Sequence, residues 1–141
     1  MPELPEVETV RRGLAGLIVG KVVASTQHDT DKSFPNADAD VKGFLIGASI
    51  RAIHRRAKVL LIDLSTDYTL MVHLKMTGQL VYVDADVRFG AGHPNDSLVN
   101  ALPDSSTRVT IVFEDGSILY FNDQRKFGWM KLLPTIEVPY I

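Results

Sequence analysis

The sequence predicts a mainly β fold, a two-layer antiparallel β-sandwich of about eight strands with two flanking α-helices. Its 141 residues suffice for one domain that buries roughly two-thirds of its unfolded surface. Eight short runs rich in β-branched and aromatic residues lie between turn residues. Most connections between these runs are too short for helical crossovers, which favours antiparallel pairing. Asp115-Gly116, between two of the runs, is a strong β-hairpin signal.

The two helices are predicted from apolar residues that recur every three or four positions. The first helix covers 5–19, where Glu8 and Arg12 also form an i,i+4 pair on another face, and Gly20 ends it. The second helix covers 38–46 and ends at the next glycine. The apolar stripes are Val7, Val10, Leu14, Leu17 and Ile18 in the first helix, and Val41, Phe44 and Leu45 in the second.

The strands account for most of the remaining chain. In order, they are expected at 21–28, 49–56, 59–64, 69–74, 79–83, 108–114, 117–122 and 128–133. Segments 29–37 and 84–107 are rich in Gly, Pro, Asn, Asp and Ser, and we expect both to be loops. A loop as long as the second is usually functional or disordered. We place the sandwich domain at 1–133 and interpret 134–141 as a tail or the start of a linker.

The composition limits the chemistry that this chain can perform. It has no cysteine, which excludes disulfides, a thiolate nucleophile and a cysteine-based zinc site within it. No apolar run approaches the length of a membrane span, so we expect a soluble, intracellular, monomeric protein without a membrane partner. The net charge of −2 does not indicate nucleic acid, but the cations are unevenly placed. They gather at Arg51, Arg55, Arg56 and Lys58, and again at Arg125 and Lys126.

Pro2 is the first candidate functional residue, because removal of Met1 would leave its secondary amine at the start of the protein. A free α-amine has a pKa near ~8, against about 10.4 for lysine, so roughly a tenth of it is neutral and nucleophilic at pH 7. Its adduct with a carbonyl-like carbon is an iminium, an electron sink for Schiff-base chemistry. Glu3 and Glu6 lie beside it as candidate proton carriers. The alternative is an ordinary helix start, where Pro and acidic residues are favoured.

Five residues farther along the chain are candidate binding groups. Lys58 precedes an apolar strand, where it clamps a phosphate or supports a carboxylate, or else is a solvated edge lysine. His73 ends a strand and either lines a groove or is a structural histidine. Met76 lies in a tight turn, where it either wedges between bases or fills the core. Arg125 and Phe127 lie in another turn and suit DNA through a planar donor fork and a stacking ring, although loop aromatics are often buried.

Together these segments resemble one known family. The matching motifs are PELPEVETVRRG at 2–13, RRAK at 55–58, HLKMTG at 73–78 and DQRKFG at 123–128. In order and spacing they are similar to the N-terminal catalytic domain of the formamidopyrimidine-DNA glycosylase / endonuclease VIII family. The resemblance covers essentially the whole chain, and the first motif is highly specific. It implies a two-layer β-sandwich and base excision repair of damaged double-stranded DNA, in the cytoplasm or at the nucleoid.

The resemblance also implies catalytic roles. Pro2 would attack the sugar carbon that bears an oxidised, flipped-out base, and Glu3 would protonate the ring oxygen as the sugar opens. The resulting iminium acidifies the neighbouring carbon, so strand cleavage by elimination follows. Glu6 would be a supporting carboxylate, and Lys58 matches the lysine assigned to the elimination step and to phosphate contact.

The other matching residues would bind DNA. His73 matches a contact to the DNA backbone, and Met76, Arg125 and Phe127 match the residues that fill the gap left by the flipped base. Phe127 within RKFG favours the branch of the family that prefers oxidised purines such as 8-oxoguanine.

The sequence departs from the family pattern in three places. Gln124 and Lys126 replace the Pro and Arg that are more usual in that turn. Ser106-Thr107-Arg108 stands where the family commonly carries a His-Asp-His stretch with a DNA contact, and Arg108 is a candidate replacement. The family's C-terminal DNA-binding domain, with its zinc finger, is not among these residues. We therefore expect a fragment without a cofactor, weak or inactive alone.

Two other functions fit parts of the pattern. A noncatalytic DNA-binding domain would keep the scaffold, but the complete set of Pro2, Glu3 and Lys58 weighs against loss of chemistry. A tautomerase would use an N-terminal proline as a general base. In that architecture the proline begins a strand, whereas the pattern over 5–19 predicts a helix.

Overall fold

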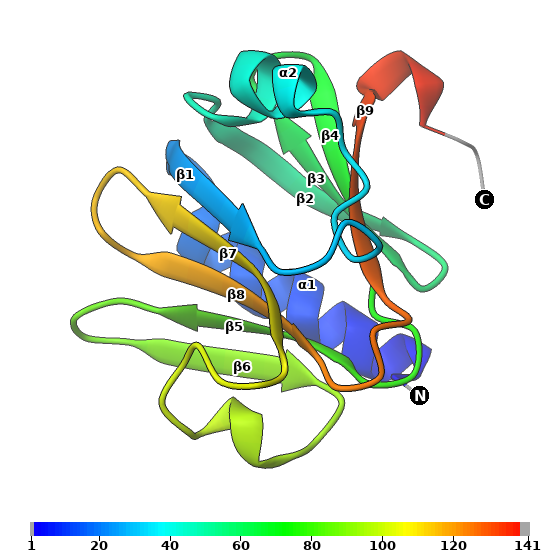
Figure 1. The fold of residues 1–141 in the computed structure, drawn as a ribbon, viewed down its shortest axis with the longest axis vertical. Coiled ribbons are helices and arrows are strands. Elements are labelled where there is room, and N and C mark those ends of the chain that lie inside the picture. The colour runs from blue at the N-terminus through cyan, green and yellow to red at the C-terminus, as the bar shows by residue number, and fades with distance from the viewer. Residues whose placement is uncertain (1, 139–141) are drawn as a thin grey trace.

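Two antiparallel β-sheets packed against each other form the centre of the molecule, whose computed structural model describes residues 2–138 (Figure 1). In chain order the strands are β1 (Val23–His28), β2 (Ile50–Arg56), β3 (Val59–Leu64), β4 (Tyr68–His73), β5 (Gly78–Val83), β6 (Arg88–Gly92), β7 (Thr107–Phe113), β8 (Ile118–Asp123) and β9 (Trp129–Pro134). One sheet has the order β1-β7-β8-β5-β6 and the other the order β2-β3-β4-β9. The predicted antiparallel β-sandwich is confirmed, with nine strands in this part of the chain rather than eight.

Helix α1 (Leu4–Ile18) closes one side of the sandwich. Its apolar stripe is buried at Val7, Val10, Leu14 and Ile18, as the spacing predicts. The helix contacts β2 and β6, which are edge strands of different sheets. The stripe joins one continuous hydrophobic core with residues from both sheets, so burial of this face fixes the helix, and with it residues 2 and 3, against the sandwich.

Two tight turns follow the sequence signals closely. The hairpin between β7 and β8 turns at Asp115-Gly116, where Gly116 has a φ of 89°, a conformation that glycine adopts without strain. The hairpin between β2 and β3 turns at Ala57-Lys58, because Arg56 pairs directly with Val59. Ala57 takes a φ of 49° there. Lys58 is thus held at the tip of a rigid two-residue turn.

Segment 84–107 is not the irregular loop that its composition predicts. It contains β6, which pairs with β5, and a short 3-10 helix η2 (Asp96–Leu98). The Phe89 ring lies against α1 so closely that a Cβ at Gly13 would be 2.1 Å from it. The Arg88 guanidinium donates to backbone carbonyls of η2 and of Asn100, which folds the rest of the segment back onto the sheet.

Segment 29–37 lacks strands, as predicted, but covers the outer edge of β9. The Met130 N–H donates to the Ser33 carbonyl at 2.9 Å, and the Leu132 N–H donates to the Asn36 side chain at 2.7 Å. The Asn36 amide in turn donates to the Met130 carbonyl at 3.1 Å. These bonds satisfy strand-edge groups that would otherwise be open to pairing with another chain.

The second predicted helix forms in two parts, α2 (Asp38–Asp40) and a π-helical turn η1 (Val41–Leu45). At the other end of the chain a 3-10 turn η3 (Thr135–Glu137) follows β9. The Thr135 N–H donates to the Asp67 carbonyl at 2.8 Å, and Val138 packs on a small cluster on the outer face of β3 and β4. The domain boundary at 133 stays a prediction, and 139–141 lie outside the described residues. Of the helices within residues 2–138, none has the length and apolar character to cross a membrane.

Candidate functional site

The start of α1 and the β2–β3 turn meet at one corner of the molecule. Glu3 is the N-cap of α1, in extended conformation, and its carbonyl accepts the N–H groups of Glu6 and Val7, each at 3.0 Å. Its carboxylate Oε2 lies 3.3 Å from the Lys58 Nζ. Pro2, which directly precedes Glu3 in the chain, is buried. The fold thus brings together three predicted site residues, two of which are 55 positions apart.

The Glu3–Lys58 pair is open to solvent, since 64% of the Glu3 side chain and 31% of the Lys58 side chain are exposed. An exposed ion pair of this kind contributes little to stability. Both groups are therefore free to exchange this contact for a ligand. Removal of Met1, on which a free Pro2 amine depends, concerns a residue outside those that the structure describes.

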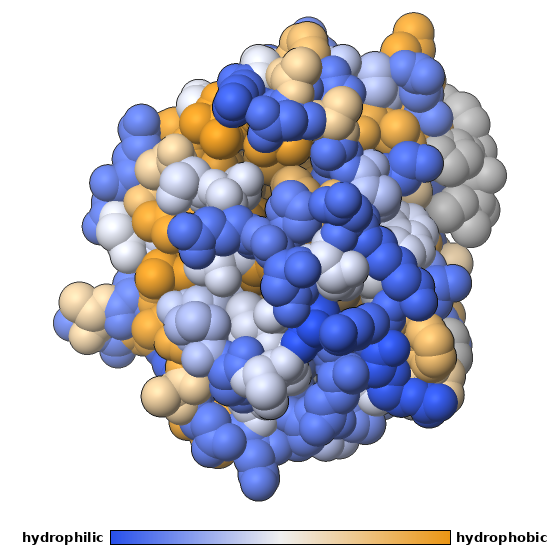
Figure 2. Space-filling view, viewed as in Figure 1, coloured by the Kyte–Doolittle hydropathy of each residue, from blue (hydrophilic) through white to orange (hydrophobic). Residues whose placement is uncertain are grey.

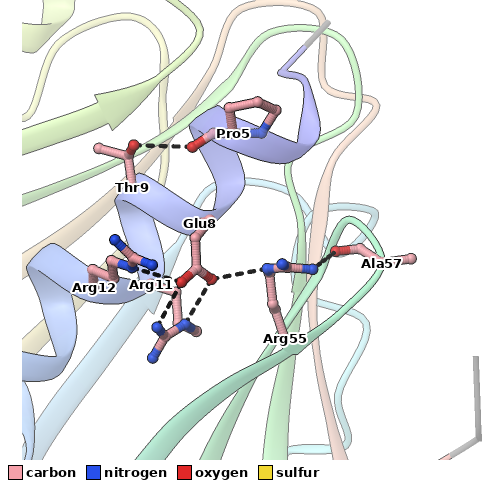
Figure 3. A network of polar contacts seen from close by, with 7 residues as sticks. All are labelled: Pro5, Glu8, Thr9, Arg11, Arg12, Arg55 and Ala57. Atoms are coloured by element: carbon pink, nitrogen blue, oxygen red, sulfur yellow. Dashed lines mark hydrogen bonds and ion pairs between the residues drawn. The ribbon is translucent and has the colours of Figure 1, made fainter.

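Glu8 joins α1 to β2 just behind this corner (Figure 3). Its carboxylate accepts from Arg11 at 2.7 and 2.8 Å, from Arg12 at 2.8 Å and from Arg55 at 2.9 Å. These hydrogen bonds, from Arg11 first, then Arg55 and Arg12, hold the pKa of Glu8 well below its usual range. Because Arg55 lies three positions before Lys58, the Glu8 clamp couples the helix start to the turn that carries this lysine.

Glu6 faces a different part of the surface. It is half-buried and lines a shallow cavity of about 150 Å³ with Thr9, Ala91 and Gly92 of β6. Glu3 instead pairs with Lys58, so the two carboxylates of the helix start face different parts of the surface. A supporting role for Glu6 stays a prediction.

His73 ends β4 directly across from Val59, the neighbour of Lys58. Its Nδ1 accepts the Lys75 N–H at 3.0 Å. Burial, and then the positive charges of Lys75 and Lys58, lower the pKa of His73. The ring is therefore neutral at pH 7 with its proton on Nε2, so it can donate one hydrogen bond.

Met76, Arg125 and Phe127 lie on two neighbouring turns and are all exposed. Met76 is in the β4–β5 turn with 39% of its surface exposed, and Phe127 is in the β8–β9 turn with 41%. The Arg125 Cζ lies 5.1 Å from the centre of the Phe127 ring, within cation–π range. Figure 2 shows hydrophilic residues gathered over the β8–β9 turn, at the lower right of the view. Neither Met76 nor Phe127 fills the core.

Two residues at these turns were not predicted from the sequence. The Lys32 Nζ lies 5.3 Å from the centre of the Phe127 ring. Lys32 belongs to segment 29–37, outside all of the motifs. Asp123 is fully buried and accepts hydrogen bonds from both turns. Lys32 gave no signal in the sequence. Asp123 begins the DQRKFG motif, and a carboxylate after a run of buried strand residues was a sign that it is structurally engaged.

Arg108 does not replace a DNA contact in the way that its position suggests. Only 5% of its side chain is exposed, and the guanidinium pairs with Asp29 at 2.8 Å. It also donates to the carbonyls of Ser105 and Ser106. The side chain therefore ties β7 to the neighbouring loops instead of facing solvent. No group of three or more His, Asp or Glu side chains in the described part of the chain is arranged to hold a metal ion.

Comparison with known proteins supplies the family. The family model for the formamidopyrimidine-DNA glycosylase N-terminal domain matches residues 1–130. The chain belongs to the formamidopyrimidine-DNA glycosylase family. Two relatives of that name come from Caulobacter sp. (strain K31), 40% identical over 98% of this chain and 47% of the relative, and from Halalkalibacterium halodurans, 43% identical over 96% and 44%.

A solved formamidopyrimidine-DNA glycosylase is also similar in structure. It is the Lactococcus lactis Fpg (MutM) in complex with DNA that contains N7-benzyl-Fapy-dG, with a TM-score of 0.79 and 32% sequence identity. The match covers 96% of this chain and 45% of the Lactococcus chain. This chain therefore spans about half the length of the family members that it matches, and it corresponds to their N-terminal domain.

Proposed function

We propose that this chain is the catalytic domain of a DNA glycosylase and AP lyase that removes oxidised bases, purines in particular, from double-stranded DNA. The observation that carries the proposal is the corner where Glu3 and Lys58 meet beside Pro2. Membership in a family named for excision of formamidopyrimidine supports the substrate class. The complex of the Lactococcus relative with DNA that contains N7-benzyl-Fapy-dG supports damaged DNA as the partner.

The proposed reaction begins at the Pro2 amine, freed by removal of Met1. The amine attacks the sugar carbon that bears the damaged base, and the glycosidic bond breaks with its electron pair leaving on the base. Glu3 gives a proton to the ring oxygen as the sugar opens, which leaves an iminium between Pro2 and the sugar. The iminium then acidifies the neighbouring carbon, so loss of that proton expels the 3′ phosphate.

Lys58 suits the second half of this reaction. At the tip of the β2–β3 turn its ammonium is partly exposed and already paired with a carboxylate, so a phosphate oxygen can replace that partner. His73, with one N–H available to donate, suits a contact to the DNA backbone. Met76, Arg125 and Phe127 suit the gap left by the flipped base. The tautomerase alternative is not favoured, because α1 begins at Leu4 where that architecture needs a strand.

Trapping with borohydride tests the proposal. Reduction of the iminium should link the Met-free protein covalently to an oligonucleotide that contains an abasic site, and Pro2→Gly should abolish most of this product. The matched control is Pro35→Gly, in the segment that covers the edge of β9. Intact mass must first show that Met1 is absent. Failure of the Met-free protein to form any adduct at low salt would favour the noncatalytic DNA-binding alternative.

Substrate preference needs a separate measurement. Duplexes with 8-oxoguanine, formamidopyrimidine or an oxidised pyrimidine should be compared at equal protein concentration. We expect faster release of the two purine lesions. Faster release of the pyrimidine lesion would contradict the assignment that rests on Phe127, but would leave the Schiff-base chemistry intact.

A further inference from the structure

Asp123 has an unusual setting for a carboxylate. It ends β8, and none of its surface is exposed. Oδ1 accepts the hydroxyl of Thr77 and the N–H of Arg125, the second at 3.3 Å, and Oδ2 accepts the N–H of Gly128 at 2.6 Å. All three donors are neutral. A fully buried carboxylate depends on such donors, so their positions and that of Asp123 are fixed together.

The three donors to Asp123 belong to Arg125 itself and to the residues that directly follow Met76 and Phe127. Thr77 follows Met76, Gly128 follows Phe127, and Arg125 donates directly. The Arg125 N–H also donates to the Thr77 hydroxyl oxygen at 3.1 Å, so the two turns are bonded to each other as well as to Asp123. Pairing of Gly78 with Asp123 between β5 and β8 places the carboxylate between the turns.

The backbone of both turns needs support of this kind. Lys75 and Lys126 have φ values of 53° and 60°, in the left-handed region that costs energy for residues other than glycine. Gly128 is packed so tightly that a Cβ there would lie 2.7 Å from the His73 carbonyl and 3.0 Å from the Asp123 Oδ2. The turn that carries Phe127 therefore has little room to shift without losing its bonds to Asp123.

We propose that Asp123 is a positioning residue for the DNA interface, which sets the two turns relative to each other so that Met76, Arg125 and Phe127 enter the duplex as one unit. The inference rests on the proposed function, because it assumes that these three side chains occupy the gap left by a flipped base. Asp123 itself is buried and makes no contact with DNA. By fixing the two turns in advance, Asp123 lowers the conformational entropy that Met76, Arg125 and Phe127, together called the wedge, lose when DNA binds.

The test is the ratio of borohydride trapping on duplex abasic DNA to trapping on the same abasic strand alone. Only the duplex has a second strand, and hence a gap in a base stack that the three side chains can fill. Asp123→Asn keeps the shape of the side chain but replaces one carboxylate oxygen with an NH₂ group. That group is a donor, and it faces the donors of Thr77, Arg125 or Gly128. We expect the ratio to fall by about ten-fold or more, because a misplacement of ~1 Å in a positioned group can cost far more than that. General loss of folded protein would lower both yields equally and leave the ratio unchanged.

Asp115→Asn is the matched control. Asp115 lies in the turn before β8, where it likewise accepts a backbone N–H and a hydroxyl, both from Ser117, and in addition pairs with Lys21. We expect its ratio to match the wild type. As a second readout, 2-aminopurine opposite the abasic site should brighten when the wild-type wedge unstacks it, and should brighten much less with Asp123→Asn.

Three outcomes separate the inference from the proposed function. If the wild type gives no adduct, the proposed function fails. If Phe127→Ala lowers the ratio but Asp123→Asn does not, the positioning role is wrong while the interface stands. If Asp123→Asn does not fold, Thr77→Val removes one donor from the same carboxylate and must lower the ratio in the same direction; an unchanged ratio in a folded Thr77→Val then overturns the inference.

Discussion

Glu8 and Asp123 each join segments that are distant in the sequence, but by opposite means. Glu8 lies at a partly exposed surface and accepts from three arginines. Asp123 lies in the interior and accepts only from neutral groups. Loss of the first leaves three cations that water can solvate, whereas loss of the second leaves buried donors without partners. The start of α1 is thus held by solvent-exposed ion pairs, and the turns that carry Met76 and Phe127 are held by buried hydrogen bonds.

The largest effect is expected at the buried carboxylate. Asp123→Ala should lower the free energy of unfolding by about 3 kcal/mol, since at least one buried N–H loses its acceptor. Urea unfolding followed by circular dichroism measures this change. Asp115→Ala, in the exposed turn between β7 and β8, should cost much less. If both variants lost the same free energy of unfolding, the burial of Asp123 would not explain its contribution to stability.

Gly128→Ala tests how tightly the β8–β9 turn is packed. The added Cβ meets the backbone carbonyl of His73 at 2.7 Å, so the variant should lose about 1–3 kcal/mol of stability through overpacking. Gly16→Ala is the matched control, because nothing lies within 4 Å of its Cβ. In the helix it should stabilise by roughly 0.5–1 kcal/mol. A neutral Gly128→Ala would show that the turn can move.

Glu8→Gln should have a smaller effect that depends on salt and pH. The pKa of Glu8 is lowered from its ordinary 4.5, so its contribution to stability is present above that pH and is lost as the pH falls toward the lowered pKa. The difference in Tm between wild type and Glu8→Gln should therefore shrink below about pH 4.5. It should also shrink between about 0.1 and 1 M NaCl, as the Debye length falls from roughly 10 to 3 Å. The Asp123→Asn difference should persist at high salt; if it shrank equally, the contrast between the two carboxylates would be wrong.

The smallest effect concerns His73. Its pKa is lowered by burial and by the charges of Lys75 and Lys58, so NMR titration should find it below the ordinary 6.5. The neutral form is the one that the fold favours, and the associated stability is present above pH 6.5 and is lost as the pH falls through the lowered value. Lys58→Met should raise this pKa modestly. A pKa at or above 6.5 would contradict the lowering by burial and by the two lysines.

Local patterns explain why much of the fold could be predicted. The stripe from Val7 to Ile18 needs only helical periodicity, and the Asp115-Gly116 hairpin needs only two residues, so both were evident without tertiary context. Strand β6 was missed because Gly90 and Gly92 are poor strand formers. It exists through pairing with β5 and through the packing of Phe89 on α1, which no local pattern contains.

In the candidate site, too, contacts within one element could be predicted and contacts between distant segments could not. The pair of Glu8 with Arg12 follows from helical spacing and is confirmed, but the clamp to Arg55 spans 47 positions. The Glu3–Lys58 contact spans 55 positions and was not predicted, since the family resemblance gave each residue a role without pairing the two. Asp123 and Thr77 are 46 positions apart, and neither residue type alone indicates a buried bond between them. Side chains that join distant turns are visible only once the register of β5 and β8 is known.

The most direct test of the account is to locate the covalent bond itself. After borohydride trapping of the Met-free protein on abasic DNA, proteolysis and mass spectrometry identify the peptide that carries the sugar. We predict that the sugar is on the N-terminal peptide, attached to the nitrogen of Pro2. Attachment to Lys58 or to any other lysine would contradict it, because the nucleophile would then be a side chain and not the amine at the start of α1.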